Sequence, residues 1–119
     1  MRFERTKRFD QDVKALRKRF RSLDQDLETL TKVIAVRPIP PTSFSVEIPG
    51  YSSEIKIVKV RKMACRSLPG RGSHTGLRLI YASYGQTIVF LELYFKSDQE
   101  REAHDRILDF VNQRASELP

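Results

Sequence analysis

Two neighbouring segments, residues 77–84 and 87–95, limit most strongly what this chain can fold into. The sequence LRLIYASY is followed by Gly85 and Gln86, and then by TIVFLELYF. Runs rich in β-branched and aromatic residues on either side of a short glycine-containing turn are typical of a β-hairpin. We therefore expect two long antiparallel strands joined at Gly85 and Gln86.

Side chains of a strand alternate between the two faces of a sheet, so each strand divides into two sets. The sets predicted to face the core are entirely apolar: Leu77, Leu79 and Tyr81, with Val89, Leu91, Leu93 and Phe95. The opposite sets are Arg78, Ile80 and Ala82, with Ile88, Phe90, Glu92, Tyr94 and Lys96. The predicted sheet therefore has one apolar face and one face that carries charge.

A further strand is predicted at residues 53–65, SEIKIVKVRKMAC, because its residues also alternate. Val58 and Val60 would face the core, which places Lys59 and Arg61 on the charged face. The outer face would then be a partly covered groove that holds Lys59, Arg61, Arg78, Tyr94 and Lys96 beside apolar side chains. These apolar neighbours are Ile57, Ile80, Ile88 and Phe90.

The N-terminal third has helical rather than strand periodicity, after a short strand at RFERT. Phe9, Val13, Leu16, Phe20 and Leu23 recur at steps of three and four, which predicts an amphipathic helix. A second helix would start at an Asp24 N-cap and end before RPIPP, with Leu27, Leu30, Val33 or Ile34, and Ala35 on its apolar face. The two would form a helical hairpin.

The rest of the chain completes one domain, residues 1–119. Residues 38–53 are interrupted by proline and glycine, which predicts a surface loop, and residues 66–76 form a glycine-rich connection. Residues 97–118 are predicted to form a terminal helix capped by Ser97 or Asp98. The expected fold class is α+β, in the order β-α-α-β-β-β-α, with a small antiparallel sheet packed on the helical hairpin.

The charge balance favours a nucleic-acid or acidic protein partner. The chain has 22 Lys and Arg against 15 Asp and Glu, a net charge of +7. No apolar run reaches the ~20 residues of a membrane span and no signal peptide is evident, so we expect a cytoplasmic protein that does not bind membranes. One cysteine and no Cys/His cluster predict neither a metal site nor a cofactor.

An arginine fixed on a strand is suited to hold a phosphate through two parallel hydrogen bonds, so Arg78 is a candidate binding residue. The alternative is that Arg78 forms a structural ion pair with Glu92. One carboxylate cannot neutralise the four cations Lys59, Arg61, Arg78 and Lys96, so the charge excess favours phosphate binding. For His74 and His104, an ordinary surface position is the favoured interpretation, although His74 could swing into the groove as a general acid.

The segments IVKVRKM and GLRLIYASYGQTIVFLELYFKSDQERE, with the helical hairpin before them, resemble the RelE/ParE toxin superfamily, especially its RelE and HigB-like branch. The resemblance implies a toxin of a type II toxin-antitoxin system. Such a toxin is an endoribonuclease that cuts mRNA in the ribosomal A site, on the 30S subunit, and inhibits translation. An acidic antitoxin protein would hold it inactive.

The resemblance also implies roles for individual residues. Arg78 is similar to the strand arginine that contacts the scissile phosphate, Lys59 and Arg61 to a neighbouring basic pair, and Lys96 to a lysine at the end of the last strand. Cleavage would be metal-free, through attack of the 2′-hydroxyl on its own phosphate. Arg78 and Arg61 would stabilise charge, and Lys59 would act as base because neighbouring cations lower its pKa. Lys96 or Tyr94 would stabilise or protonate the leaving oxygen.

Two other functions fit the same sequence. A ParE-like relative would bind a protein target such as DNA gyrase without nuclease chemistry. A degenerate relative would bind only RNA or an antitoxin-like segment. The clustered cations favour the RNA interpretation, because a pure protein-binding module does not need a phosphate clamp.

Overall fold

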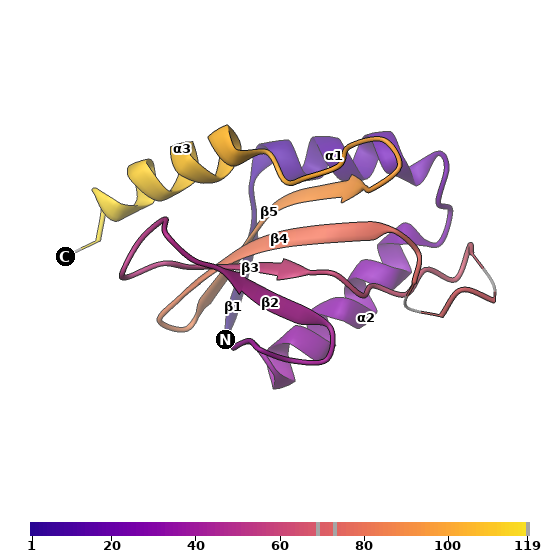
Figure 1. Cartoon of the computed structure of the whole chain (residues 1–119), viewed down its shortest axis with the longest axis horizontal. Helices are drawn as coiled ribbons and strands as arrows, with labels where there is room; N and C mark the ends of the chain where they lie inside the picture. The colour runs from indigo at the N-terminus through magenta and orange to yellow at the C-terminus, as the bar shows by residue number, and fades with distance from the viewer. Residues whose placement is uncertain (69, 73, 119) are drawn as a thin grey trace.

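The computed structural model describes residues 1–68, 70–72 and 74–118. These residues form three helices and a five-stranded sheet, so the α+β prediction is confirmed (Figure 1). The elements follow in the order β1 (Arg2–Arg5), α1 (Lys7–Arg17), α2 (Leu23–Val36), β2 (Ser45–Ile48), β3 (Lys56–Val60), β4 (Leu77–Tyr84), β5 (Thr87–Phe95) and α3 (His104–Ala115). Within the described ranges, no helix is long and apolar enough to cross a bilayer.

The sheet is mixed rather than purely antiparallel, because β1 lies parallel to β5 at one edge. The strand order is β1-β5-β4-β3-β2. The expectation of a loop throughout residues 38–53 is wrong, since β2 pairs antiparallel with β3 through Ser45 and Val60 at one end and Ile48 and Ile57 at the other. A four-residue edge strand between prolines is too short to show a clear alternation in sequence.

The α1–α2 hairpin covers one face of the sheet, as the helical periodicity predicts. Phe9, Val13 and Leu16 are buried on α1 and Leu27, Leu30 and Ile34 on α2. The α1 helix ends at Arg17, earlier than expected, yet Phe20 stays in the core beyond it. Thr6 caps α1 by accepting a hydrogen bond from the Phe9 N–H at 3.1 Å. At α2 the N-cap is Ser22 rather than Asp24, whose carboxylate instead binds Arg17.

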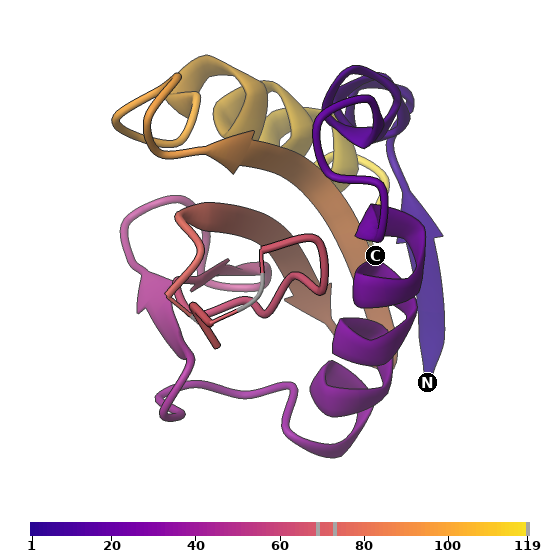
Figure 2. The ribbon, with the colours of Figure 1, turned by 90° about the vertical axis from the view of Figure 1, so that its right-hand side faces the viewer.

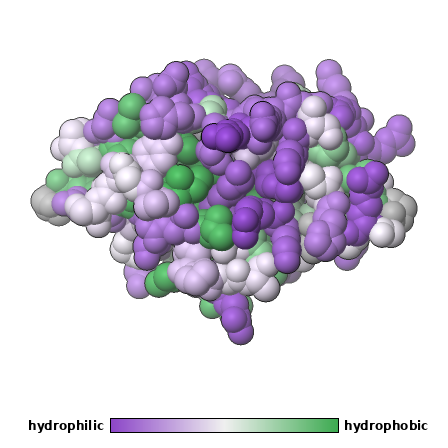
Figure 3. Space-filling view, viewed as in Figure 1, coloured by the Kyte–Doolittle hydropathy of each residue, from purple (hydrophilic) through white to green (hydrophobic). Residues whose placement is uncertain are grey.

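The opposite face of the sheet is not an open charged groove, because α3 covers it. Ile107 and Val111 of α3 pack on a second apolar cluster, whose other members are Ile55, Ile57, Ile80, Ala82, Val89, Leu91 and Tyr94. Figure 2 shows α3 and α2 on different sides of the sheet. Figure 3 shows a largely hydrophilic surface on this side of the molecule, with small separate hydrophobic patches. The sheet therefore has two apolar faces.

The predicted faces of β5 are wrong up to and including Leu91 and correct after it. Ile80 pairs with Glu92 and Tyr81 with Phe90, so Leu91 is an extra residue, a β-bulge. Ile88 and Phe90 therefore lie in the core under the helical hairpin, while Val89 and Leu91 pack in the cluster under α3. A one-residue shift moves every side chain beyond it to the other face.

The terminal helix begins at His104, not near Ser97 or Asp98. Asp98 is bound to Arg19, so it does not cap α3. The cap comes instead from the sheet, because Oε1 of Glu92 accepts a hydrogen bond from the Ala103 N–H at 2.8 Å. A carboxylate at this position satisfies a free N–H and interacts favourably with the positive end of the helix. The start of α3 is thus determined by a residue on β5.

Candidate nucleic-acid interface

The ends of β3, β4 and β5 form an open pocket of about 460 Å³, termed here the cationic pocket. Three of the five predicted site residues line it: Arg61 after β3, Arg78 on β4 and Lys96 after β5. The glycine-rich connection adds Arg71 and His74 to the same lining. The structure therefore brings four cationic side chains and one imidazole together at one end of the sheet.

The backbone beneath the pocket is held by contacts between segments that are distant in sequence. The buried Thr75 hydroxyl donates to the Met63 carbonyl at 2.7 Å and accepts from the Leu77 N–H at 3.2 Å. The Lys96 N–H donates to the Gly76 carbonyl at 2.8 Å, which ties the end of β5 to the start of β4. These bonds fix the strand ends that carry Arg78 and Lys96.

Glycine is required at position 76 for two reasons. Its φ of +86° lies in the left-handed region, and a Cβ atom there would stand 3.0 Å from Cε1 of Phe95, which also lines the pocket. Residues other than glycine rarely adopt such a φ. Gly76 therefore allows the chain to turn closely beside Phe95 and enter β4.

The electrostatics of the pocket favour an anion. Among the residues that the structure describes, no Asp or Glu lines it. None of the ion pairs among the described residues involves Arg61, Arg71, Arg78 or Lys96. Within the described part of the chain, the half-buried Arg78 guanidinium makes one hydrogen bond, from Nη1 to the Leu77 carbonyl at 3.2 Å, which leaves donors for a ligand. Like charges in one pocket repel each other, so a bound anion such as a phosphate would stabilise them.

The suggested pairing of Arg78 with Glu92 is not what the structure shows. Glu92 is buried and lies 3.7 Å from the Arg106 guanidinium of α3. It also accepts hydrogen bonds from Gln99 and from the Ala103 N–H, both at 2.8 Å. The structural partner of Glu92 is α3, and Arg78 stays available at the pocket.

Lys59 and Tyr94, the other two predicted site residues, are not among the described residues that line the cationic pocket. Tyr94 packs in the apolar cluster under α3, and Lys59 contacts the segment before that helix. The Lys59 ammonium is 2.9 Å from Oε1 of Glu102 and 6.0 Å from the centre of the Tyr94 ring. Tyr94 is 4% exposed, and its hydroxyl has no hydrogen-bond partner in the part of the chain that the structure describes. Burial raises the pKa of Tyr94.

The expected lowering of the Lys59 pKa is wrong. Burial acts to lower this pKa, but the neighbouring Glu102 carboxylate and Tyr94 hydroxyl outweigh it and raise the pKa. A lysine that keeps its proton more firmly is a poorer general base. The geometry therefore does not support the role of base for Lys59. This side chain instead links β3 to the segment before α3.

Sequence reasoning did not include Arg71 in the site and treated His74 as a surface residue. His74 is exposed, and its backbone forms a parallel bridge with Met63, which carries the connection back to the end of β3. The signal in the sequence was the high density of Gly, Arg and His in the glycine-rich connection. No group of three His, Cys, Asp or Glu side chains arranged to hold a metal ion occurs in the described residues.

Comparisons with known proteins support the fold but no family. No protein-family model matches the sequence, and no curated protein matches it. Among solved structures, the chain is similar to a copper-bound point mutant of a toxin from Helicobacter pylori, with a TM-score of 0.53 and 15% sequence identity. The match covers 83% of this chain and 98% of the toxin. At this identity the likeness concerns the fold alone, so the protein shares the fold of a bacterial toxin.

Proposed function

We propose that this protein is the toxin of a type II toxin-antitoxin system and cuts mRNA on the ribosome, with the scissile phosphate bound in the cationic pocket. The observation that carries the proposal is the convergence of Arg61, Arg71, Arg78 and Lys96 on one open pocket, where no carboxylate occurs among the described lining residues. The toxin-like fold agrees with this function. Because translation takes place in the cytoplasm, the protein would act there.

The proposed reaction needs no metal ion. The 2′-oxygen of the substrate attacks the adjacent phosphorus and loses its proton to a base, while the bond from phosphorus to the 5′-oxygen breaks. The 5′-oxygen takes up a proton as it leaves, so the products are a 2′,3′-cyclic phosphate and a 5′-hydroxyl. Catalysis then requires cationic donors at the phosphate and groups that transfer protons.

The side chains of the pocket divide between these tasks. Arg78 and Arg61 would bind the non-bridging phosphate oxygens, since guanidinium groups remain charged and match phosphate geometry. His74 would transfer a proton, because imidazole can both accept and donate one near neutral pH. Lys96 would stabilise the charge that develops on the 5′-oxygen.

The openness of the pocket supports dependence on the ribosome. In-line attack needs the 2′-oxygen, the phosphorus and the 5′-oxygen to be aligned. The pocket presents charged groups on one side of a bound strand, and the ribosome would supply the remaining constraint on the RNA. We expect slow cleavage of free RNA. An acidic antitoxin would suit the net charge of +7 as the inhibitory partner.

The test is induction of the wild type beside Arg78→Ala and Arg101→Ala in growing bacteria, with primer extension on a translated message. Arg101 is an exposed arginine outside the pocket and serves as the matched control. We expect growth arrest and cuts in phase with codons for the wild type and Arg101→Ala. Loss of an arginine that binds the transition-state charge should lower cleavage by roughly 10²–10³-fold.

Three outcomes would contradict the proposal in different ways. Cleavage that persists in Arg78→Ala would remove the cationic pocket from the mechanism. Growth arrest without RNA cuts would favour a protein target such as DNA gyrase. Binding of RNA or antitoxin with neither arrest nor cuts would favour a degenerate binder.

A further inference from the structure

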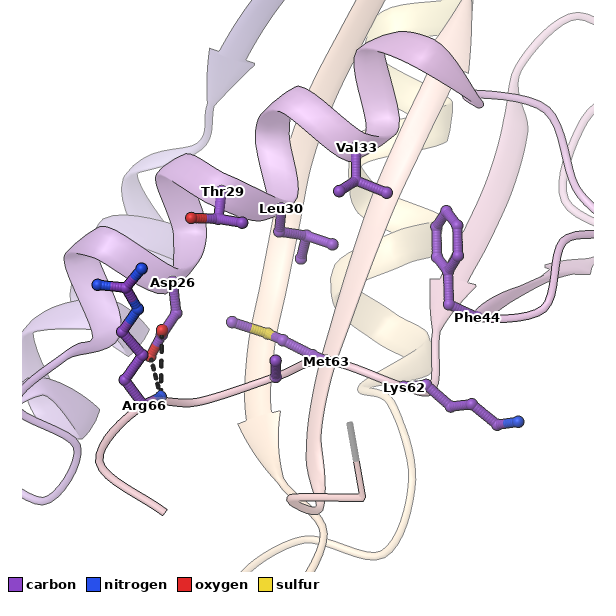
Figure 4. Close-up of a pocket in the computed structure, with 9 residues that line it drawn as sticks. Asp26, Thr29, Leu30, Val33, Phe44, Lys62, Met63 and Arg66 are labelled. Atoms are coloured by element: carbon purple, nitrogen blue, oxygen red, sulfur yellow. Dashed lines mark hydrogen bonds between the residues drawn. The ribbon is translucent and has the colours of Figure 1, made fainter. Parts of the chain in front are cut away.

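A buried carboxylate that does not line the cationic pocket lies near the start of α2. Asp26 is 7% exposed and takes part in no ion pair among the described residues. Its two oxygens accept hydrogen bonds from the Arg66 N–H, at 3.2 and 3.3 Å (Figure 4). Oδ2 also accepts from the Ser22 hydroxyl at 2.7 Å. Because removing a charge from water is costly, these hydrogen bonds have to offset the burial of Asp26.

The Ser22 hydroxyl joins Asp26 to the glycine-rich connection. A carboxylate can only accept, so Ser22 donates its proton to Asp26 and its oxygen remains free to accept. This oxygen accepts from the N–H and from the hydroxyl of Ser67, both at 2.8 Å. In return, the Ser22 N–H donates to Oγ of Ser67 at 2.8 Å. The four residues Ser22, Asp26, Arg66 and Ser67 are termed here the α2 clasp.

The α2 clasp is not a helix cap. Ser22 stands at the N-cap position of α2, where a serine hydroxyl usually accepts a hydrogen bond from the first turn of the helix. Among the described residues, the Ser22 side chain makes no such bond. Its hydroxyl is used for Asp26 and Ser67 instead, so the clasp holds two backbone N–H groups of the connection, those of Arg66 and Ser67, on the helix.

The connection is thereby held on both sides of Arg71. Before it, the clasp binds Ser67, four residues earlier in the chain. After it, His74 forms the bridge with Met63, and the His74 N–H donates to the Arg71 carbonyl at 2.9 Å. Neither Arg71 nor His74 takes part in an ion pair among the described residues, so the course of the backbone places their side chains at the pocket. Without the clasp, the connection would gain conformational freedom before Arg71.

We propose that Ser22 and Asp26 are positioning residues: through the α2 clasp, they place the side chains of the connection that bind phosphate in the cationic pocket. These side chains are Arg71 and His74. The inference rests on the proposed function, because it takes an RNA phosphate as the ligand of the pocket. The strands place the other cations of the pocket, so the clasp would determine one side of the site and leave the other side unchanged.

The test is the affinity of the purified full chain for a fluorescein-labelled, single-stranded oligonucleotide with 2′-deoxy sugars, which offers phosphates but no attacking hydroxyl. Fluorescence anisotropy gives Kd for the wild type, for Ser22→Ala and for Ser22→Thr, which keeps the hydroxyl. Ser22→Ala is also measured in a chain that already carries Arg71→Ala and His74→Ala. Ser52→Ala is the matched control, because its half-buried hydroxyl likewise accepts two hydrogen bonds, each at 3.1 Å, and Ser52 is not among the described residues that line the pocket.

The expected effect of Ser22→Ala depends on the chain that carries it. In the wild-type chain it should raise Kd about fivefold, less than the roughly tenfold expected for loss of a whole charge-assisted contact. With Arg71 and His74 already replaced, it should raise Kd by less than about twofold, because no side chain of the connection is left to misplace. Ser22→Thr and Ser52→Ala should bind like the wild type. The Ser67 amide should lose protection from hydrogen exchange in Ser22→Ala.

Several results would overturn the proposal. One is a Kd for Ser22→Ala within about twofold of the wild-type value. Another is an equal loss of affinity in both chains, because a general effect on the fold would act with or without Arg71 and His74. A wild type that does not bind the oligonucleotide would also count against it. If circular dichroism shows that Ser22→Ala does not fold, Ser67→Ala takes its place, since it removes the other hydroxyl of the same pair.

Cleavage of a translated message is measured separately, so the proposed nuclease and the α2 clasp can fail independently. A loss of affinity confined to the chain with intact Arg71 and His74, together with no RNA cleavage by the wild type, would support the clasp and contradict the nuclease. Cleavage in phase with codons, together with an unchanged affinity of Ser22→Ala, would contradict the clasp and leave the nuclease in place.

Discussion

Arg106 links α3 to two other elements, and its replacement by alanine tests how much this link stabilises the fold. Arg106 binds Asp12 of α1 through both terminal nitrogens, at 2.9 and 3.2 Å. Nη2 also donates to the Leu91 carbonyl at 2.6 Å, in the bulge of β5, and Nη1 lies 3.7 Å from Glu92. One side chain thus joins α3 to both α1 and β5.

The expected loss of stability follows from what the truncation leaves behind. Removing one member of a buried ion pair typically costs 3–5 kcal/mol, because the remaining charge is left without a partner. The side chains of Arg106 and Asp12 are 18% and 20% exposed, so water partly solvates Asp12 after the truncation. Glu92 also keeps its hydrogen bonds from Gln99 and Ala103 when Arg106 is removed. We therefore expect Arg106→Ala to lower the free energy of unfolding by about 3 kcal/mol, at the lower end of that range.

The assay is urea unfolding followed by far-UV circular dichroism, with Arg101→Ala as the control. Arg101 is exposed, so its truncation should change stability by no more than about 0.5 kcal/mol. A double mutant that also carries Asp12→Ala should be less destabilised than the sum of the single changes, because the two residues share one interaction. A loss below about 1 kcal/mol for Arg106→Ala would refute the reasoning and show that the apolar contacts of Ile107 and Val111 hold α3 by themselves.

Three further predictions concern the pocket and the core. Arg78→Ala should lower the free energy of unfolding by about 1 kcal/mol or less in the same urea assay, because the bond of its guanidinium to the Leu77 carbonyl is the one hydrogen bond of this group among the described residues; a large loss would mean that Arg78 is structural. Gly76→Ala should destabilise by roughly 1–3 kcal/mol in the same assay, since its φ is +86° and the new Cβ would stand 3.0 Å from Phe95; an unchanged midpoint would contradict the close packing. Burial raises the pKa of Tyr81 and Tyr94 above the ordinary value of 10.0. The stability that comes from keeping these phenols protonated is therefore present below pH 10 and is lost as the pH rises above it. The free energy of unfolding should fall by up to about 1.4 kcal/mol per pH unit for each phenol. Tyr81→Phe should flatten this alkaline loss in urea titrations, and an unchanged slope would rule Tyr81 out as its source.

The helical hairpin and the fold class could be predicted because their signals are local. The positions of Phe9, Val13 and Leu16 repeat with the helical period, and that period determines one face whatever the helix packs against. The alternation at Val58 and Val60 predicted the face of β3 correctly for the same reason. A short edge strand such as β2 has too few residues to give a comparable signal.

The faces of β5 could not be predicted, because a bulge has no signal in a single strand. The extra residue Leu91 is defined by the register with β4 and by the packing of α3 on one side. The start of α3 could not be predicted for a related reason. Its N-terminus is capped by Glu92 of β5, a residue far from the helix in sequence, while Asp98 binds Arg19.

The candidate site likewise combines residues that the sequence predicted with residues that only the fold brings together. Arg61, Arg78 and Lys96 were expected on one face, and they meet because neighbouring antiparallel strands bring their ends together. Lys59 was grouped with them on the same alternation, yet it is paired with Glu102, in the segment before α3. Arg71 and His74 join the pocket only because the glycine-rich connection returns to the end of β3 at Met63.

The sequence by itself indicated the three helices and the strands other than β2, the apolar sides of α1 and α2, and the excess of positive charge. Periodicity and composition are properties of neighbouring residues, so no knowledge of the rest of the chain was needed. Only the tertiary structure decided which cations remain open to a ligand. That outcome depends on where α3 and the segment before it lie, because this segment brings Glu102 to Lys59, and such contacts join residues that are far apart in sequence.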